Sequence, residues 1–170
     1  MKVHQAIQTK RAVRNFKDQR LSEEEVRTIL NAGRRAQSSK NTQPWHFIAV
    51  QDKDRLKALS ETGTYASHLA GAALGIAIIT PPFTNRWSIM FDAGQAAAYM
   101  QIAAWELGIG SVPATIYDTE AAKELLKIPD EYEIYVALSF GYPQDDQTLT
   151  RPPERGGRRP FEDAVHWETW

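Results

Sequence analysis

Polar and apolar residues near the amino terminus recur with the period of a helix. Ser22 and Glu25 have the spacing of a capping box, and the positions after them follow the i, i+3, i+4, i+7 rule of one buried helix face. These apolar or small positions are Val26, Ile29, Leu30 and Gly33. The pattern predicts a helix that ends near Ala36, preceded by a shorter helix around Val3 and Ile7.

Short apolar runs predict four strands. Residues 46–50 and 74–80 are expected to be buried strands, and two prolines stop the second one. Two further strands are predicted over 110–116 and 134–140, the last ending at a Gly-Tyr-Pro turn.

Three more helices are predicted around these strands. Residues 53–62 and 120–127 have the composition of short surface helices. The longest helix, over 89–107, is apolar or small at nearly every position, so we expect it to be buried on all faces. Gly108 follows it and is expected to take the left-handed conformation that ends many helices.

The order of these elements predicts the α+β class, with a central mixed sheet flanked by helices. At 170 residues the chain is expected to be a single domain, 1–170, whose last part, 144–170, is an extended arm. Residues 144–159 are rich in Pro, Gly, Arg and Asp and cannot form a core of their own. Apolar side chains nevertheless follow them: Phe161, Val165, Trp167 and Trp170. An arm that crosses and packs on another subunit would bury these residues.

Composition excludes several classes of function. A formal net charge of -1 gives no general attraction to nucleic acid or to anionic membranes. The absence of cysteine excludes disulfides, thiolate nucleophiles and Cys-ligated metal clusters, and the four histidines are too scattered to predict a metal site. The longest apolar run, 69–79, is too short to span a bilayer. We expect a cytoplasmic protein whose redox chemistry would need a bound cofactor.

Two polar segments are candidates for a site. Lys10, Arg11 and Arg14 place three cations within one short span, which is typical either of a solvated basic face or of an anion site. Residues 38–43 place small polar side chains on a turn before Pro44, as either an ordinary helix-to-strand connection or a binding loop would. Further cations near the carboxyl terminus favour a shared phosphate site.

Several motifs follow one another in order along nearly the whole chain. They are Ile7-x-x-Lys10-Arg11-Ala12-Val13-Arg14-x-Phe16, Ser38-Ser39-x-Asn41-x-Gln43-Pro44-Trp45, Asp92-x-Gly94-x-Ala96, Leu107-Gly108-Ile109-Gly110-Ser111, Gly141-Tyr142-Pro143 and Arg158-Arg159-Pro160-Phe161. As an ordered set they resemble the nitroreductase family of FMN-dependent NAD(P)H oxidoreductases. The resemblance implies FMN as cofactor, NADH or NADPH as electron donor, and an intertwined homodimer with two flavins at its interface.

The resemblance also implies roles for the cations. Lys10 and Arg158 would bind the FMN phosphate through charge-assisted hydrogen bonds, with Arg11 assisting at that end. Arg14 would lie beside the pyrimidine edge of the ring, where a positive charge raises the reduction potential. Arg155 and Arg159 are further candidates near the phosphate.

Other segments would contact the ring and the ribityl chain. One matches the loop that reaches the flavin of the partner subunit: Ser38, Ser39 and Asn41. A second would lie along the ring, with a backbone N–H near N5: Pro113, Ala114, Thr115 and Ile116. Ser67 and His68 are candidates for a ribityl or pyrimidine contact, although a lone histidine before an apolar strand is more often a capping or surface residue.

The chain departs from the family pattern at three positions. Ala12 stands where many relatives have Ser, which removes one ribityl hydrogen bond worth roughly 1 kcal/mol. Gln37 replaces a Pro before the two serines, and Gly156 replaces a phosphate-binding Lys. These changes predict weaker FMN binding. Asp92, at the start of a predicted helix, is expected to stabilise the helix dipole rather than to act as a catalytic acid.

Two functions from different classes fit these residues. The first is an oxidoreductase that transfers a hydride from NAD(P)H through FMN to a nitroaromatic, a quinone or a similar small acceptor by a ping-pong mechanism; it needs no protein nucleophile, because the cofactor carries the chemistry. The second is a flavin-binding module without turnover, for storage or sensing. The short segment between Thr80 and Trp87 leaves little room for covering helices, so an open substrate pocket is expected.

Overall fold

The structure, a computed structural model, describes residues 3–150 and 157–170. Its strands are β1 (His46–Val50), β2 (Leu74–Thr80), β3 (Gly110–Thr115) and β4 (Glu133–Gly141). Its helices are α1 (Val3–Thr9), α2 (Glu23–Arg34), α3 (Lys53–Ser60), α4 (Ser88–Glu106), α5 (Thr119–Leu126) and α6 (Phe161–Ala164). The strands and helices predicted with explicit ends are confirmed to within two residues.

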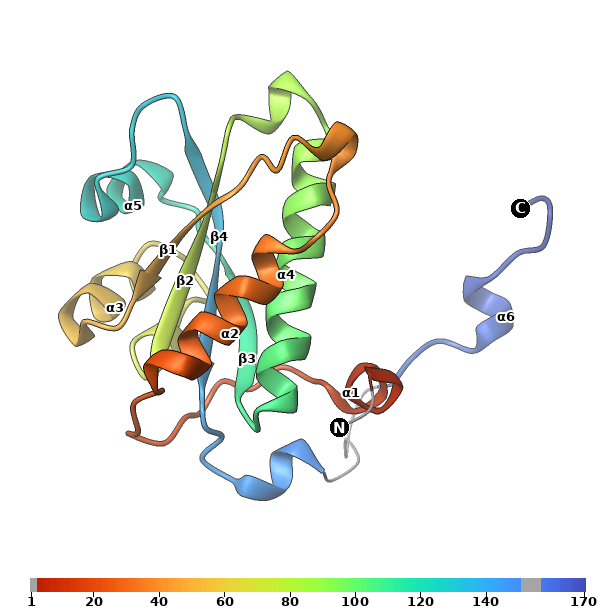
Figure 1. The fold of residues 1–170 in the computed structure, drawn as a ribbon, viewed down its shortest axis with the longest axis horizontal. Coiled ribbons are helices and arrows are strands. Elements are labelled where there is room, and N and C mark those ends of the chain that lie inside the picture. The colour runs from red at the N-terminus through yellow and green to blue at the C-terminus, as the bar shows by residue number, and fades with distance from the viewer. Residues whose placement is uncertain (1–2, 151–156) are drawn as a thin grey trace.

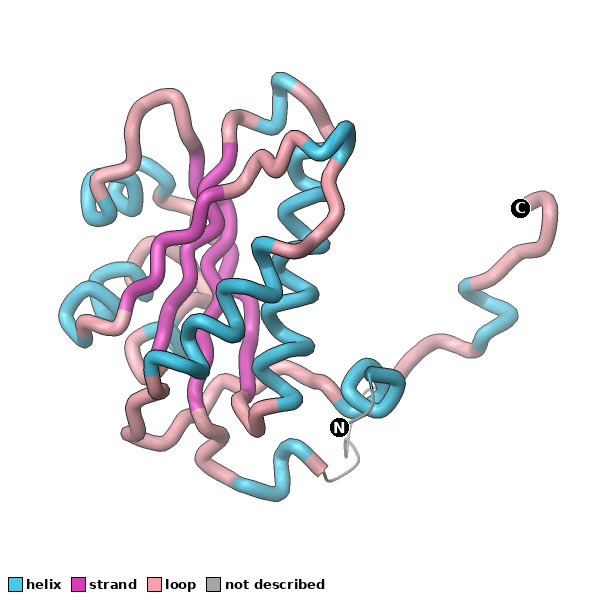
Figure 2. The backbone as a smooth tube through the Cα atoms, in the orientation of Figure 1, coloured by secondary structure: helices cyan, strands magenta, loops and turns pink. Residues whose placement is uncertain are grey.

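One sheet lies between two layers of helices (Figure 1, Figure 2). Its order is β1-β2-β4-β3, and each neighbouring pair of strands is antiparallel. The α+β class is confirmed. We expected a mixed sheet, but parallel pairing in the described residues is limited to an isolated bridge between Ala12 and Ser111.

The central strand β2 is buried along its whole length and divides the core in two. Leu74, Ile76 and Ile78 pack with α2 and α4 on one face of the sheet, whereas Ala77 and Ile79 pack toward α3 and α5 on the other. This alternation follows from the two-residue period of a strand.

The capping box of α2 is confirmed. The Ser22 hydroxyl accepts from the Glu25 N–H at 3.2 Å, and the Glu25 carboxylate accepts from the Ser22 N–H at 2.7 Å. Gly33 lets α2 approach α4, because a Cβ at this position would lie 2.7 Å from Met100 Cγ. Gly108 has a φ of 78°, so the predicted left-handed cap of α4 is also confirmed.

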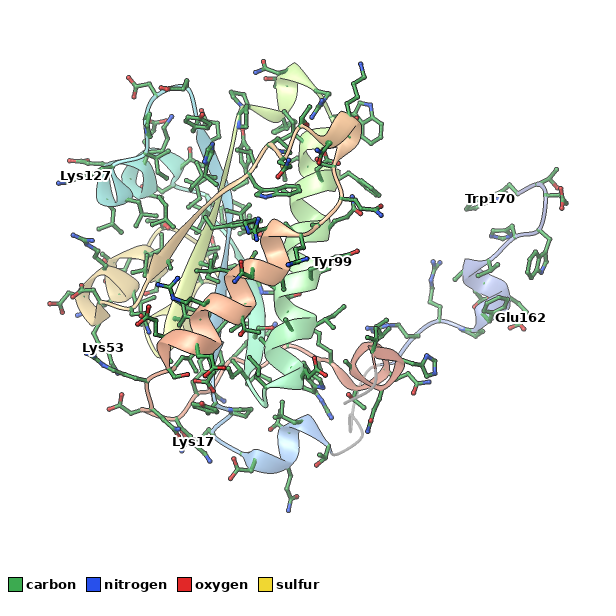
Figure 3. The ribbon with its side chains drawn as sticks, in the orientation of Figure 1. Lys17, Lys53, Tyr99, Lys127, Glu162 and Trp170 are labelled. Atoms are coloured by element: carbon green, nitrogen blue, oxygen red, sulfur yellow. The ribbon has the colours of Figure 1, made fainter. Side chains whose placement is uncertain are left out.

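Two expectations about burial are wrong for the single chain. β1 lies at an edge of the sheet, and His46 and Ala49 are exposed, because the layers of helices cover this edge incompletely. α4 is buried on only one side: Phe91 is 63% and Tyr99 43% exposed on the other (Figure 3). A helix that is apolar all round therefore leaves an apolar face uncovered.

The chain continues after β4 into a short 3-10 helix, Asp146–Leu149, and a terminal segment, 157–170, that lies away from the sheet and its helices (Figure 1, Figure 3). Trp167 is 77% exposed and Trp170 fully exposed. Their ring contacts are local, with Phe161 at 6.5 Å and with His166 at 4.5 Å. Leu149 packs against the cluster of Ala6, Val13 and Trp105, whereas the tryptophans of segment 157–170 remain exposed in the single chain.

No helix in the described ranges combines the length and apolar character needed to cross a membrane.

Candidate functional site

A cavity of about 780 Å³ lies beside β3, the strand at the second edge of the sheet. This volume is within the range of small-molecule sites. Its lining comes from three separate parts of the chain and from Gln144: Arg14, Asn15, Phe16, Thr64, Tyr65, Ser67, His68, Gly71, Pro113, Ala114, Thr115, Tyr117 and Gln144. These described lining residues include no carboxylate, and Arg14 is their one permanently charged side chain.

The segment that leads into the cavity is extended and alternates its side chains. Val13 is buried, its N–H donates to the Ser111 carbonyl at 3.1 Å, and it fills the space where Gly110 has no Cβ. Residues two apart in an extended chain share a side. Ala12, which forms a bridge with Ser111, and Arg14 therefore lie on the side opposite Val13. Lys10 directly follows α1, and its N–H donates to the Ala6 carbonyl at 2.8 Å.

Lys10 marks one end of this segment. Its ammonium is half-buried and donates to Gln101 Oε1 of α4 at 3.0 Å. Burial lowers the pKa of Lys10, and repulsion from Arg158 lowers it further. Two cations that repel each other indicate a place where an anion would be stabilised.

Arg14 and His68 mark the other end. His68 lies on the short 3-10 helix Ser67–Leu69, is 8% exposed, and has its Nδ1 2.8 Å from Ser139 Oγ. Burial lowers the pKa of His68, and the Arg14 charge lowers it further. The imidazole is therefore neutral at neutral pH, and the positive charge at this end belongs to Arg14.

Lys10 does not line the cavity, one wall of which is β3. Pro113, Ala114 and Thr115 line the cavity, whereas Ile116 is buried in the core on the α3 and α5 face. The Ile116 N–H already donates to the Tyr135 carbonyl at 2.9 Å. Gly63 packs against this wall, since a Cβ there would lie 2.3 Å from the Thr115 carbonyl oxygen.

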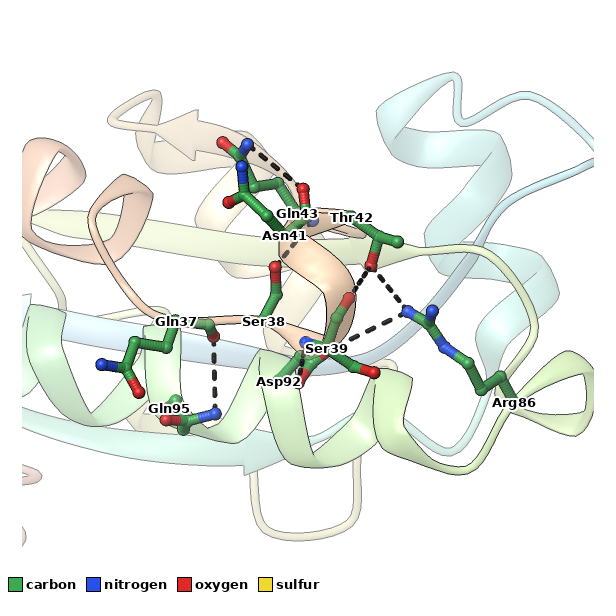
Figure 4. A network of polar contacts seen from close by, with 9 residues as sticks. All are labelled: Gln37, Ser38, Ser39, Asn41, Thr42, Gln43, Arg86, Asp92 and Gln95. Atoms are coloured by element: carbon green, nitrogen blue, oxygen red, sulfur yellow. Dashed lines mark hydrogen bonds and ion pairs between the residues drawn. The ribbon is translucent and has the colours of Figure 1, made fainter.

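The predicted loop residues Ser38, Ser39 and Asn41 do not line the cavity. They lie beside the first half of α4, in a network of polar contacts (Figure 4). Asp92 is 2% exposed and accepts the Ser39 N–H at 3.1 and 3.2 Å. Arg86 lies 3.7 Å from the Asp92 carboxylate and donates to Thr42 Oγ1 at 2.7 Å.

This network corrects the expected role of Asp92. The residue is the fifth of α4, not in its first turn, and its carboxylate holds the backbone of a loop rather than a helix end. The loop conformation requires stabilising contacts, because Lys40, Asn41 and Gln43 all have positive φ, which is unfavourable for residues other than glycine.

The remaining predicted residues are placed as follows. Arg11 is half-buried, and Ser67 lines the cavity next to His68. Arg158 and Arg159 are exposed at the start of the terminal segment, and Arg155 and Gly156 lie outside the described residues. Several lining residues were not predicted, among them Asn15, Tyr65, Tyr117 and Gln144, since no motif marks them and only the fold brings them together.

The sequence model of the Nitroreductase family matches residues 7–62 and 60–142. The chain belongs to the nitroreductase family. Its motifs and its α+β fold are both features of that family.

Individual relatives cover almost the whole chain. A protein of Archaeoglobus fulgidus, named provisionally as an NADH dehydrogenase/NAD(P)H nitroreductase, is 34% identical over 171 residues, 96% of each chain. An iodotyrosine deiodinase of Thermotoga neapolitana is 28% identical over 160 residues, 80% of this chain and 86% of its own. The solved structure of an FMN-dependent nitroreductase from Clostridium difficile superposes with a TM-score of 0.84 at 29% identity, over 98% of this chain and 99% of that one.

The residues present fit FMN. The donors at Lys10 suit a phosphate, and the cavity lining combines apolar residues such as Phe16 and Pro113, which would suit a flat ring, with the polar Arg14 and His68. Between the ends, Ala12 supplies no hydroxyl, and Ser111 Oγ beside it is buried without a hydrogen-bond partner. The extended run from Lys10 to Arg14 spans at most roughly 14 Å.

Proposed function

We propose that this chain is an FMN-dependent oxidoreductase that takes a hydride from NADH or NADPH and passes it to a small acceptor such as a nitroaromatic or a quinone. The observation that carries the proposal is the short segment after α1, which places Lys10 against Gln101 of α4 and Arg14 in a cavity where it is the one permanent positive charge among the described lining residues. Membership of the nitroreductase family and the FMN-dependent relative of similar structure support it.

The chain's own residues would divide the work. Lys10 and Arg158 neutralise the phosphate, and Arg14 stabilises negative charge at the pyrimidine edge. Bound FMN would accept the hydride, with its two electrons, and pass the reducing equivalents on to the acceptor. Pro113 and Thr115 orient the ring, and the neutral His68 contributes polarity without a second positive charge.

We also infer that residues 1–170 act as one FMN-binding domain within a homodimer. The outer face of α4 exposes Phe91 and Tyr99, and the terminal segment exposes two tryptophans, so both need a partner to be buried. Ser38, Ser39 and Asn41, which lie outside the cavity of their own chain, would contact the flavin of the second subunit, and residues 144–170 would be the exchanged arm.

Steady-state kinetics test the reaction. One open cavity that serves donor and acceptor in turn predicts parallel double-reciprocal plots with NADH or NADPH and a quinone. Intersecting lines would contradict the ping-pong order. Failure of both nicotinamides to bleach the bound flavin without oxygen would favour the alternative, a flavin-binding module without turnover.

A further inference from the structure

A buried amide lies next to the proposed phosphate-binding end. Gln101, in the second half of α4, is 9% exposed, and its Oε1 accepts from Lys10 at 3.0 Å. Its Nε2 is buried and has no hydrogen-bond partner in the structure. A buried donor left unpaired costs free energy, so this atom needs an acceptor.

The orientation of the amide follows from its neighbour. A lysine ammonium has three donors and no acceptor, so Gln101 must direct its oxygen toward Lys10 and its NH₂ group elsewhere. A second hydrogen bond joins the end of α1 to α4: Trp105 Nε1 donates to Thr9 Oγ1, next to Lys10, at 2.9 Å. Both contacts lock the position of Lys10 relative to the helix.

Apart from Gln101 Oε1, which already accepts from Lys10, the groups identified at this end are donors. They are the Lys10 ammonium, the Gln101 amide NH₂ and, close enough to repel Lys10, the Arg158 guanidinium. A set of donors without a carboxylate suits an oxyanion with several acceptor oxygens, and it suits neither a metal ion nor an apolar group.

We propose that Gln101 is a phosphate ligand: it fixes Lys10 through Oε1 and donates from Nε2 to an oxygen of the terminal phosphate of FMN. This inference rests on the proposed function and adds to it a residue on α4 that lies outside the basic segments. The consequence is that Gln101 contributes to the preference for FMN over riboflavin, which lacks the phosphate.

The test compares dissociation constants of FMN and riboflavin for the full chain, measured by flavin fluorescence. Gln101→Leu removes both polar atoms and is expected to weaken FMN binding by roughly tenfold or more, because hydrogen bonds to charged groups are strong. Riboflavin binding should stay within about twofold, since the two ligands share the ring and the ribityl chain. Gln101→Glu keeps the contact with Lys10 but opposes the phosphate, so it should lower FMN affinity further.

Gln95 provides a matched control on the same helix. Its Nε2 lies 3.4 Å from the Gln37 carbonyl and does not contact Lys10, so Gln95→Glu should leave the ratio of the two affinities unchanged. Thermal unfolding checks that each variant folds, and Gln101→Met replaces Gln101→Leu if that variant does not. In a Lys10→Ala background, part of the Gln101 effect should persist, because Nε2 binds the phosphate directly.

The outcomes separate this inference from the proposed function. A chain that binds neither flavin would overturn both. A chain that binds FMN and riboflavin alike, or whose preference is unchanged in Gln101→Leu, would overturn the role of Gln101 and leave flavin binding intact. A Gln101 effect that disappears entirely in Lys10→Ala would overturn direct donation to the phosphate.

Discussion

At the residue scale, Lys10 and Arg14 lie in different surroundings. Both residues are cations, but Lys10 contacts α4 through Gln101, whereas Arg14 lines the cavity. In the proposed function, charge at the first position would act on a phosphate that does not change during the reaction. Charge at the second would act on a ring whose charge changes on reduction, so position alone would distinguish their effects.

Arg14→Ala is therefore expected to lower the flavin reduction potential. Loss of a charge about 4 Å from the ring costs about 1–4 kcal/mol, which is roughly 20–90 mV for a two-electron couple. Lys10→Ala should instead weaken FMN binding by roughly tenfold or more and change the potential little. Potentiometric titration and flavin fluorescence measure the two effects. Equal effects of both variants would mean that ring and phosphate are misplaced.

A hydrogen bond between Tyr142, the residue after β4, and Glu25 joins the sheet to α2. The Tyr142 hydroxyl donates to Glu25 at 2.5 Å, which raises the pKa of Tyr142 to about 12. Burial raises the pKa of Glu25, but hydrogen bonds from Tyr142 and Ser22 outweigh burial, so the net pKa lies below its ordinary value of 4.5. The stability that this carboxylate provides is complete above pH 4.5 and is lost as the pH falls through the folded pKa.

Tyr142→Phe should lower the free energy of unfolding by roughly 1 kcal/mol at pH 7. The difference from the wild type should shrink when urea unfolding is repeated at a pH below the Glu25 pKa, because the protonated carboxyl is a weaker acceptor. Tyr132→Phe, which removes a hydroxyl from the loop before β4, serves as the control and should show no such pH dependence. A Tyr142→Phe effect that is the same at both pH values would contradict the assigned contact.

At the scale of elements, loop 37–43 is held in place by Asp92 and Gln95 of α4 and by Arg86, which precedes α4. Asp92→Ala removes the acceptor of the Ser39 N–H and leaves Arg86 without its carboxylate. Trypsin should then cut faster after Lys40, as followed by mass spectrometry. Gln95→Ala, which loses only a 3.4 Å contact with Gln37, is the matched control. An unchanged cleavage rate in Asp92→Ala would show that the loop holds its strained conformation without this network.

The elements themselves could be predicted because their signals are local. Ser22 and Glu25 fix the start of α2, prolines end β2, and Gly108 ends α4. Burial could not be predicted as well, since it depends on neighbours in space. The apolar run of β1 gives no sign that the strand lies at an edge, and the composition of α4 does not distinguish a face covered within the chain from one left for a partner.

At the scale of the whole molecule, the exposed face of α4 predicts the dimer contact. A Cβ at Gly94 would have no atom within 4 Å, so Gly94→Arg adds a long cation without a clash inside the chain. This variant should sediment as a monomer, whereas the wild type and Thr28→Arg, on the exposed side of α2, should sediment as dimers. A dimeric Gly94→Arg would place the interface elsewhere.

The assembly of the site is also a property of the whole molecule. The resemblance to the family predicts roles for Lys10, Arg14 and the run from Pro113 to Thr115. Gln101 and Ser139 carry no such signal, since they contact Lys10 and His68 across separations of 91 and 71 residues. The lining residues Tyr65 and Gln144 were not predicted either, because residues far apart in the sequence meet at the cavity only in the folded chain.

The visible spectrum of the purified chain after addition of FMN and removal of free flavin tests the central claim most directly. We expect flavin absorbance that stays with the protein at one FMN per chain, because the cavity at Arg14 and the donors at Lys10 and Gln101 together suit the ring and the phosphate. A colourless protein that retains no flavin after this treatment would contradict it.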